Sequence, residues 1–255
     1  MRWHAPTQCV LAVAVVLALP VASFAQVKVL MSGGFAAAYQ EVLPEFERTT
    51  GITVATTRGQ SQGDVPTAIG PQLRRGVPAD VVILSREGLD DLIKEGRITA
   101  GTDVDLAHTP LGVAVRAGAP KPDISTVEAF TATLRRAASV TFPSSTTGIW
   151  MVTTLFPKLG IADDMARKST SAGLSAMAEG KVDLAIQPVS ELLHVPGVDF
   201  AGALPAEIQY ISVFSAALVA GSNEPGAARR LIAFLASDSV RSAIAASGME
   251  PPRRK

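Results

Sequence analysis

The sequence predicts an α/β protein of two α/β lobes that are joined by two crossing strands and separated by a cleft. Short β-branched runs alternate with amphipathic segments in both halves of the chain. This alternation favours right-handed βαβ units with largely parallel strands. Two longer extended stretches, residues 111–117 and 209–219, bracket the second set of units. We expect these stretches to cross between the lobes as a hinge.

The first 25 residues have the pattern of an export signal. Arg2 precedes the apolar run Cys9–Ala22, and residues 23–25 follow the small-x-small rule for cleavage. The run has 14 residues, fewer than the about 20 that a membrane span needs. We therefore expect residues 1–25 to be cleaved after export to the periplasm, and the mature chain not to insert into the membrane.

The mature chain has few of the residues that disulfides, metal sites or imidazole catalysis require. The only cysteine, Cys9, lies in the export signal, and of the three histidines only His108 and His194 follow it. We expect no lipid anchor, no metal site and no cofactor. Without Arg2, 22 basic residues face 23 acidic ones, a net charge of about −1, so no strong field attracts nucleic acid. We expect a monomer.

Three strands are expected in the first lobe, because each candidate run is almost continuously apolar, as a parallel strand covered on both faces requires. These runs are residues 27–31, 52–56 and 80–84. Apolar residues three and four positions apart predict helices between and after them. The expected helices are 35–46 with a kink at Pro44, 64–75, and 86–95 with Leu89, Leu92 and Ile93 facing inward.

The second lobe repeats this alternation. Ser125 and Glu128 have the spacing of a capping box at the start of a helix. After it we expect strands at 139–142 and 182–187, helices at 148–159 and 172–179, a long strand at 209–220, and two closing helices of which the first is 226–236. The first lobe is then expected to comprise residues 26–110 and 218–255, and the second lobe residues 111–217, with the hinge strands at its ends.

Loops that follow the strands are the candidate functional sites, since ligands of open parallel sheets bind where such loops lead into helix N-termini. Four of these loops, from both lobes, carry hydroxyls, amides or bare backbone. Any one of them could serve only as a helix cap, but together they indicate a site for a small anion. The candidate ligand-binding residues are Ser32, Gly33, Gly34, Arg58, Gln60, Ser61, Ser85, Arg86, Ser145, Thr146 and Thr147 in the loops, and Gln187 at the end of a further strand.

Arg58 and Arg86 bear on the chemistry of the ligand. Arg58 follows a strand and precedes a glycine, so its guanidinium could reach the cleft and hold a carboxylate through two hydrogen bonds. Arg86 follows the third strand and could act as a second clamp. A surface position is the alternative for Arg58, and the sequence leaves both open.

Residues 59–63, Gly-Gln-Ser-Gln-Gly, match the nucleophile elbow of hydrolases and follow a strand. A triad would need an acid and a histidine after Ser61, and Asp183 and His194 could be considered. Asp183 begins an apolar strand, however, and His194 lies in an apolar run. We therefore expect no catalytic triad and name no catalytic residue.

Four segments make nearly the whole mature chain resemble the type 2 periplasmic solute-binding proteins, in particular the branch of the molybdate-binding protein. These segments are residues 27–34, 74–85 with its Pro-Ala-Asp run, 147–150 and 180–186. The resemblance implies two α/β lobes joined by two crossing strands, in agreement with the hinge inferred above. It also implies capture of a small anion, either an organic carboxylate or an oxyanion such as molybdate, for the permease of an ABC-type transporter.

The loops depart from the molybdate-binding pattern. Gly34 stands where the resemblance implies a serine, and Arg58, Gln60 and Gln62 replace a serine-rich run. Molybdate sites of this family use neutral hydroxyls and N–H groups, so an arginine favours an organic carboxylate. The same branch includes aconitate isomerase, which makes a periplasmic isomerase of tricarboxylates the alternative. That reaction needs a base. The four loops contain no acid or histidine, so the base would have to be Asp64 turned inward or a serine.

Overall fold

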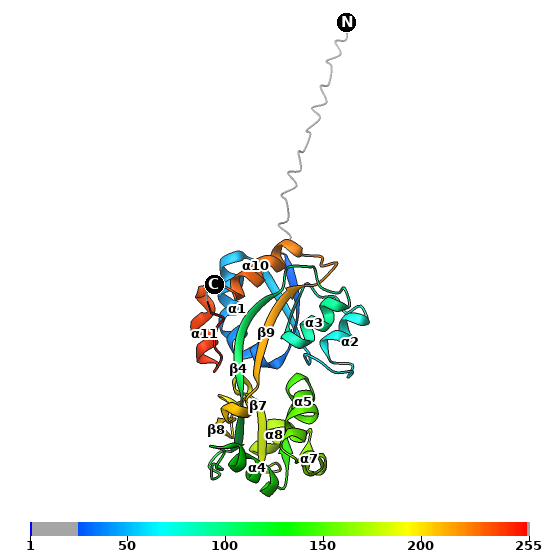
Figure 1. Cartoon of the computed structure of the whole chain (residues 1–255). Coiled ribbons are helices and arrows are strands. Elements are labelled where there is room, and N and C mark those ends of the chain that lie inside the picture. Colours follow the sequence, from blue (N-terminus) through cyan, green and yellow to red (C-terminus); the bar gives the residue numbers. More distant parts are fainter. Residues whose placement is uncertain (2–24, 254–255) are drawn as a thin grey trace.

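The chain forms two α/β lobes connected by two crossings of the chain (Figure 1). The structure, a computed structural model, describes residue 1 and residues 25–253, so residues 2–24 of the expected export signal lie outside the described part. The strand order is β2-β1-β3-β9-β4-β7-β5-β6, with β8 paired to β4. The predicted fold class is therefore confirmed. No helix among the described residues is long and apolar enough to span a membrane.

The first lobe contains a sheet of parallel and antiparallel strands. Strands β1 (Gln26–Met31), β2 (Thr53–Arg58) and β3 (Val81–Ser85) are parallel, and β9 (Ile211–Leu218) is antiparallel both to β3 and to the first half of β4 (Val104–Arg116). The helices of this lobe are α1 (Ala36–Thr50) after the short turn η1 (Gly33–Phe35), α2 (Ile69–Arg74), α3 (Arg86–Lys94), α10 (Pro225–Leu235) and α11 (Arg241–Ala246).

Two apolar cores cover the two faces of this sheet. Successive strand side chains point to opposite faces, so Val27, Val29 and Met31 pack with α1, α10 and α11. Leu30 points the other way and packs with residues of α2 and α3. The helices thereby fix the carboxyl ends of β1 and β3, where the candidate loops begin.

The second lobe is built on the other half of β4. Strand β7 (Leu184–Pro188) is antiparallel to β4, β5 (Val140–Thr141) is parallel to β7, β6 (Ser169–Thr170) is parallel to β5, and β8 (Val198–Ala203) pairs with β4. The helices are α4 (Val127–Arg136), the continuous run α5 (Thr146–Trp150), η2 (Met151–Leu155) and α6 (Phe156–Lys158), and then α7 (Ala162–Lys168), α8 (Gly173–Ala178) and α9 (Val189–Leu192).

The chain crosses between the lobes near residues 110 and 210. Residues 104–110 of β4 pair with β9, whereas residues 111–116 pair with β7 and β8. The Leu111 N–H donates to the Tyr210 carbonyl at 3.2 Å, so the two crossings lie side by side. Residues 211–218 then belong to the first-lobe sheet. The expectation that the second lobe extends to residue 217 is therefore wrong, because β9 fills the place between β3 and β4.

Several local expectations also differ from the structure. Strand β2 lies at the edge of the sheet and is mostly exposed, since it has only β1 as a neighbour. Helix α2 begins at Ile69, because residues 61–65 form bends and residues 66–67 form a turn. Thr126, not Ser125, caps α4: its hydroxyl accepts the Ala129 N–H at 3.1 Å. Ile93 is 39% exposed, so α3 turns only Leu89 and Leu92 inward.

Candidate functional site

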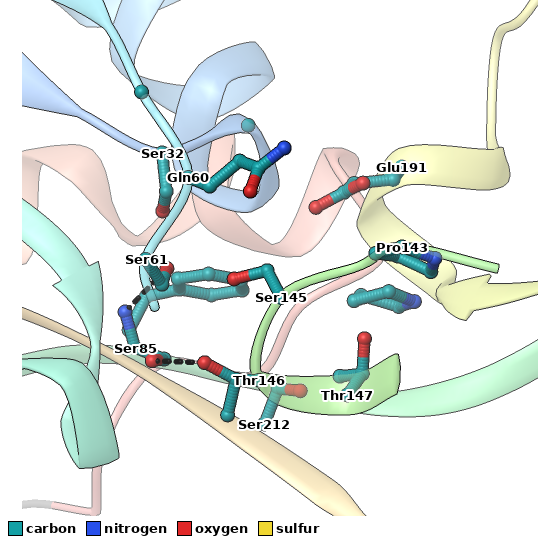
Figure 2. Close-up of a pocket in the computed structure, with 14 residues that line it drawn as sticks. Ser32, Gln60, Ser61, Ser85, Pro143, Ser145, Thr146, Thr147, Glu191 and Ser212 are labelled. Atoms are coloured by element: carbon teal, nitrogen blue, oxygen red, sulfur yellow. Dashed lines mark hydrogen bonds between the residues drawn. The ribbon is translucent and has the colours of Figure 1, made fainter. Parts of the chain in front are cut away.

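A cavity of about 130 Å³ lies between the lobes (Figure 2). The first lobe lines it with Ser32, Gly33, Gly59, Gln60, Ser61 and Ser85, and the second lobe with Pro143, Ser145, Thr146, Thr147, Pro188 and Glu191. Ser212 and Phe214 of β9 complete the lining. The volume suits a small solute, such as an organic acid or a tetrahedral oxyanion, because larger ligands fill pockets of about 300–1,000 Å³.

Strand ends position the hydroxyls of the first lobe. Ser32 follows β1 directly, and Ser85 is the last residue of β3 and the N-cap of α3. The loop after β2 folds back beside β3, so that the Ser85 N–H donates to Ser61 Oγ at 3.0 Å. Parallel strands end at the same edge of a sheet, and this arrangement brings three hydroxyls from distant parts of the sequence to one wall.

The second lobe contributes the start of the helical run 146–158. Gly148 allows a tight turn there, because a β-carbon at this position would overlap the Pro143 carbonyl. The turn places Ser145, Thr146 and Thr147 along the cavity (Figure 2). The first N–H groups of a helix have no partner within it and carry partial positive charge. This wall can therefore donate hydrogen bonds to an anion.

The two lobes contact each other around the cavity. The Gln62 N–H donates to Ser145 Oγ at 3.0 Å, and the hydroxyls of Ser85 and Thr146 share a hydrogen bond of 2.7 Å. Each of these bonds joins a loop of the first lobe to the Ser145–Thr146 turn. The structure is thus a closed form in which both lobes surround the same space.

Three polar side-chain atoms in the lining are buried without a hydrogen-bonding partner in the described chain: Ser32 Oγ, Gln60 Oε1 and Ser212 Oγ. A buried polar group without a partner costs about 1–3 kcal/mol. Ser32 is 4% exposed and Ser212 is 2% exposed. These atoms are therefore available to a solute that carries matching polar groups.

Glu191 is the single charged residue in the lining, since all the other residues there are neutral. It lies on α9, directly after β7, and its carboxylate points from the second lobe across the cavity (Figure 2). A β-carbon built on Gly33 would lie 3.5 Å from Glu191 Oε1, so the carboxylate lies beside the start of η1. Burial raises the pKa of Glu191 to about 7, and the nearby charge of Arg58 opposes this rise. Glu191 can therefore exchange a proton near neutral pH.

The structure brings together Ser32, Gly33, Gln60, Ser61, Ser85, Ser145, Thr146 and Thr147 of the candidate residues. Gln187 lies in an adjoining depression that shares Gln60, Ser145 and Glu191 with the cavity. Gly34 is buried behind the wall, where a β-carbon would overlap the Phe214 ring.

Neither arginine lines the cavity. Arg58 is exposed at the end of the edge strand β2 and acts on Glu191 only through its charge. The Arg86 guanidinium is bound to acids near the start of β4: its Nη1 lies 2.9 Å from Asp103 Oδ2 and its Nε lies 2.9 Å from Asp105 Oδ1. The two arginines expected as clamps thus lie outside the cavity lining, whose hydroxyls are neutral.

No triad forms around Ser61 among the described residues. Asp183 accepts the Ala138 N–H at 2.7 Å, and His194 is exposed after α9. The Ser61 hydroxyl accepts a backbone N–H instead. The Gly-Gln-Ser-Gln-Gly sequence therefore provides a tight loop: a β-carbon at Gly59 would lie 2.7 Å from the Thr67 carbonyl oxygen.

Three residues of the lining, Glu191, Ser212 and Phe214, lie outside the loops and strand end predicted from the sequence. Glu191 comes four positions after Gln187, the strand end that was identified, so the rule that pointed to the loops also applied there. Ser212 and Phe214 lie within β9, and only the pairing of β9 with β3 and β4 places them beside the cavity.

The model of the bacterial extracellular solute-binding protein family matches residues 27–250, which is nearly the whole described chain. This chain belongs to that family. One curated member, aconitate isomerase from Pseudomonas sp., is 38% identical over 227 residues that cover 88% of this chain and 87% of the relative. The expected family is therefore confirmed.

Solved structures of other solute-binding proteins share the fold. The periplasmic molybdate-binding protein of Azotobacter vinelandii has a TM-score of 0.72 at 18% identity, with 89% of this chain and 100% of the other covered. The sulfate-binding protein of Mycobacterium tuberculosis H37Rv has a TM-score of 0.70 at 20% identity, with 89% and 87% covered. At such identities the likeness shows the architecture alone.

Proposed function

We propose that this solute-binding protein captures a small carboxylate anion in the cavity between its lobes. The observation that carries the proposal is the lining itself. Hydroxyls that are buried without a partner in the described chain line one cavity together with Ser85 at the N-terminus of α3 and Ser145 at the N-terminus of α5. Such groups bind anions without a countercharge. We further propose that the protein works in the periplasm, as a monomer, and delivers its solute to an ABC-type transporter.

Glu191 favours an organic acid over a fully ionised oxyanion. Molybdate and sulfate carry negatively charged oxygens on all sides. In any orientation, one of these oxygens would face the Glu191 carboxylate and be repelled by it. An organic acid can instead direct its carboxylates toward Ser32 and Thr147 and present a C–H or hydroxyl group to Glu191. The related aconitate isomerase acts on a molecule of this kind, so cis- and trans-aconitate are the first ligands to test.

Thermal unfolding with a panel of anions tests this proposal. We expect aconitate or a related polycarboxylate to stabilise the protein by about 2.7 kcal/mol at 100 times its dissociation constant, because it binds only the folded state. Calorimetry should then show an affinity at least about tenfold weaker for Ser32→Ala, since a hydrogen bond to a charged group contributes about 1.5–3 kcal/mol. Ser239→Ala, an exposed serine of the same lobe, is the matched control. Tight binding of molybdate or sulfate and none of any carboxylate would overturn the proposal.

A second candidate function is isomerisation of the bound acid. It is favoured by the 38% identity to aconitate isomerase and by the presence of an acid in the cavity that can carry a proton. Incubation of the purified protein with trans-aconitate, followed by proton NMR, separates the two functions, because a pure binding protein leaves the ligand unchanged.

A further inference from the structure

Glu191 differs from buried Asp80 and from partly exposed Asp105, because no contact in the described chain holds its carboxylate in place. Asp80 accepts hydrogen bonds from Lys28 N–H and Ser222 Oγ, and Asp105 holds Arg86 and Ser215. Within residues 25–253, the Glu191 carboxylate has no hydrogen bond and no salt bridge, and only the charge of Arg58 acts on it. A partly buried acid that stabilises nothing in the free protein is free to act on a ligand.

Other groups that line the cavity with Glu191 can stabilise a developing negative charge. Ser32 Oγ and Ser212 Oγ have no partner in the described chain, and Thr147 lies at the start of the helical run of the second lobe. A carboxylate held by these donors gains negative charge when a proton leaves the carbon beside it. Preorganised donors aimed at that charge lower the barrier. The cavity thus contains a base together with donors from both lobes that can stabilise the charge.

We propose that Glu191 is the catalytic base of a proton transfer between two carbons of a bound unsaturated polycarboxylic acid. This inference rests on the proposed binding of a carboxylate in the same cavity. A C–H bond next to the C=C bond breaks, its electron pair spreads over the allylic carbons and the attached carboxylate, and the proton forms an O–H bond on Glu191. The O–H bond then breaks as the proton returns to the other end of the allylic system. The double bond has moved, Glu191 is regenerated, and no oxidant or second substrate is consumed.

The proton affinity of Glu191 agrees with this role. A general base works best when its pKa lies near the working pH, and burial raises the pKa of Glu191 to about 7. Arg58 is the charged neighbour that opposes the rise. A glutamate with the ordinary pKa of 4.5 would be a far weaker base.

The test is the exchange of substrate protons with solvent, followed by proton NMR of aconitate in D₂O. The wild-type protein should incorporate deuterium at the allylic carbons and interconvert the isomers. Glu191→Gln should slow both processes at least about 100-fold, the usual contribution of a general base, while calorimetric affinity stays within a few-fold. Glu191→Asp should recover part of the rate. Glu207→Gln, the same change at an exposed position of the same lobe, should behave as wild type.

Each outcome separates this inference from the binding function. Binding of aconitate with no deuterium incorporation by the wild type would overturn the catalytic role and leave the binding proposal intact. Undiminished exchange by Glu191→Gln would assign the base to another residue. Absence of binding to any carboxylate would remove both proposals. Far-ultraviolet circular dichroism of each variant ensures that a lost rate is not lost folding.

Discussion

The hydroxyl residues around the cavity form two groups. In one group the hydroxyls hydrogen-bond to neighbouring loops, and in the other they remain available to a ligand. Ser61, Ser85, Ser145 and Thr146 use their hydroxyls in bonds that hold the loops together. Ser32 and Ser212 make no such bond in the described chain. This division explains why hydroxyl-rich loops alone do not identify the contacts to a ligand.

The titration of Glu191 should be visible in the stability of the free protein. Its folded pKa of about 7 exceeds the ordinary value of 4.5, so ionisation costs stability as the pH rises through this range. The wild type should therefore lose up to about 3 kcal/mol relative to Glu191→Gln between about pH 5 and pH 8. Urea unfolding of both proteins without ligand measures the difference. Parallel curves across this range would show that Glu191 is already ionised at low pH.

Most of the loop residues that line the cavity could be predicted from the sequence. The rule that ligands bind at strand ends indicated Ser32, Ser85 and Thr147. The two arginines could not be placed in this way. Arg58 lies on an edge strand, and Arg86 turns to Asp103 and Asp105. Both positions depend on long-range pairing, because the acids that bind Arg86 lie at the start of β4, outside the candidate loops.

At the scale of elements, Asp80 connects β1 and β3 to the start of α10. Its carboxylate accepts hydrogen bonds from Lys28 N–H at 2.8 Å, Ser222 Oγ at 2.7 Å, and the N–H groups of Asn223 at 3.0 Å and Glu224 at 3.1 Å. Burial raises the pKa of Asp80, but these donors outweigh it and the net pKa is lowered. The Pro-Ala-Asp run is therefore a structural feature of the lobe and lies away from the cavity.

Asp80→Asn should lower the free energy of unfolding by about 2–3 kcal/mol at neutral pH, because an amide can accept only part of these bonds. Since the folded pKa is lowered, the contribution of Asp80 is present above about pH 4 and is lost as the pH falls through the folded pKa. The two urea unfolding curves should therefore converge in acid. Asp64→Asn, an exposed position, should change stability by less than about 0.5 kcal/mol. An equal loss in both variants would contradict this role.

The periodicity of the sequence was sufficient to predict most elements but not the place of β9. A run of apolar residues at 211–218 fits either lobe, and only its antiparallel pairing with β3 and β4 decides between them. Strand β8 was missed because all its residues except Ala203 are of intermediate burial, so its apolar pattern is weak. The local sequence pattern thus predicts where strands occur better than it predicts which strands pair with one another.

At the scale of the whole molecule, contacts between the two lobes stabilise the closed form. The Tyr210 ring packs against Trp150 in the second lobe, with the ring centroids 4.9 Å apart. Besides the two bonds beside the cavity, Tyr210 donates a hydrogen bond to Glu87 of α3 in the first lobe. These contacts are few compared with the apolar cores within each lobe. A hinge of this kind lets a ligand shift the balance between open and closed forms by its preference for the closed one.

A crystal structure of the protein with trans-aconitate tests the central claim most directly. The account predicts the ligand in the cavity between the lobes, with carboxylates bonded to Ser32 and to the start of the helical run at Thr147, and an allylic carbon facing Glu191. Density for the ligand at any other surface, with this cavity unoccupied, would contradict the account.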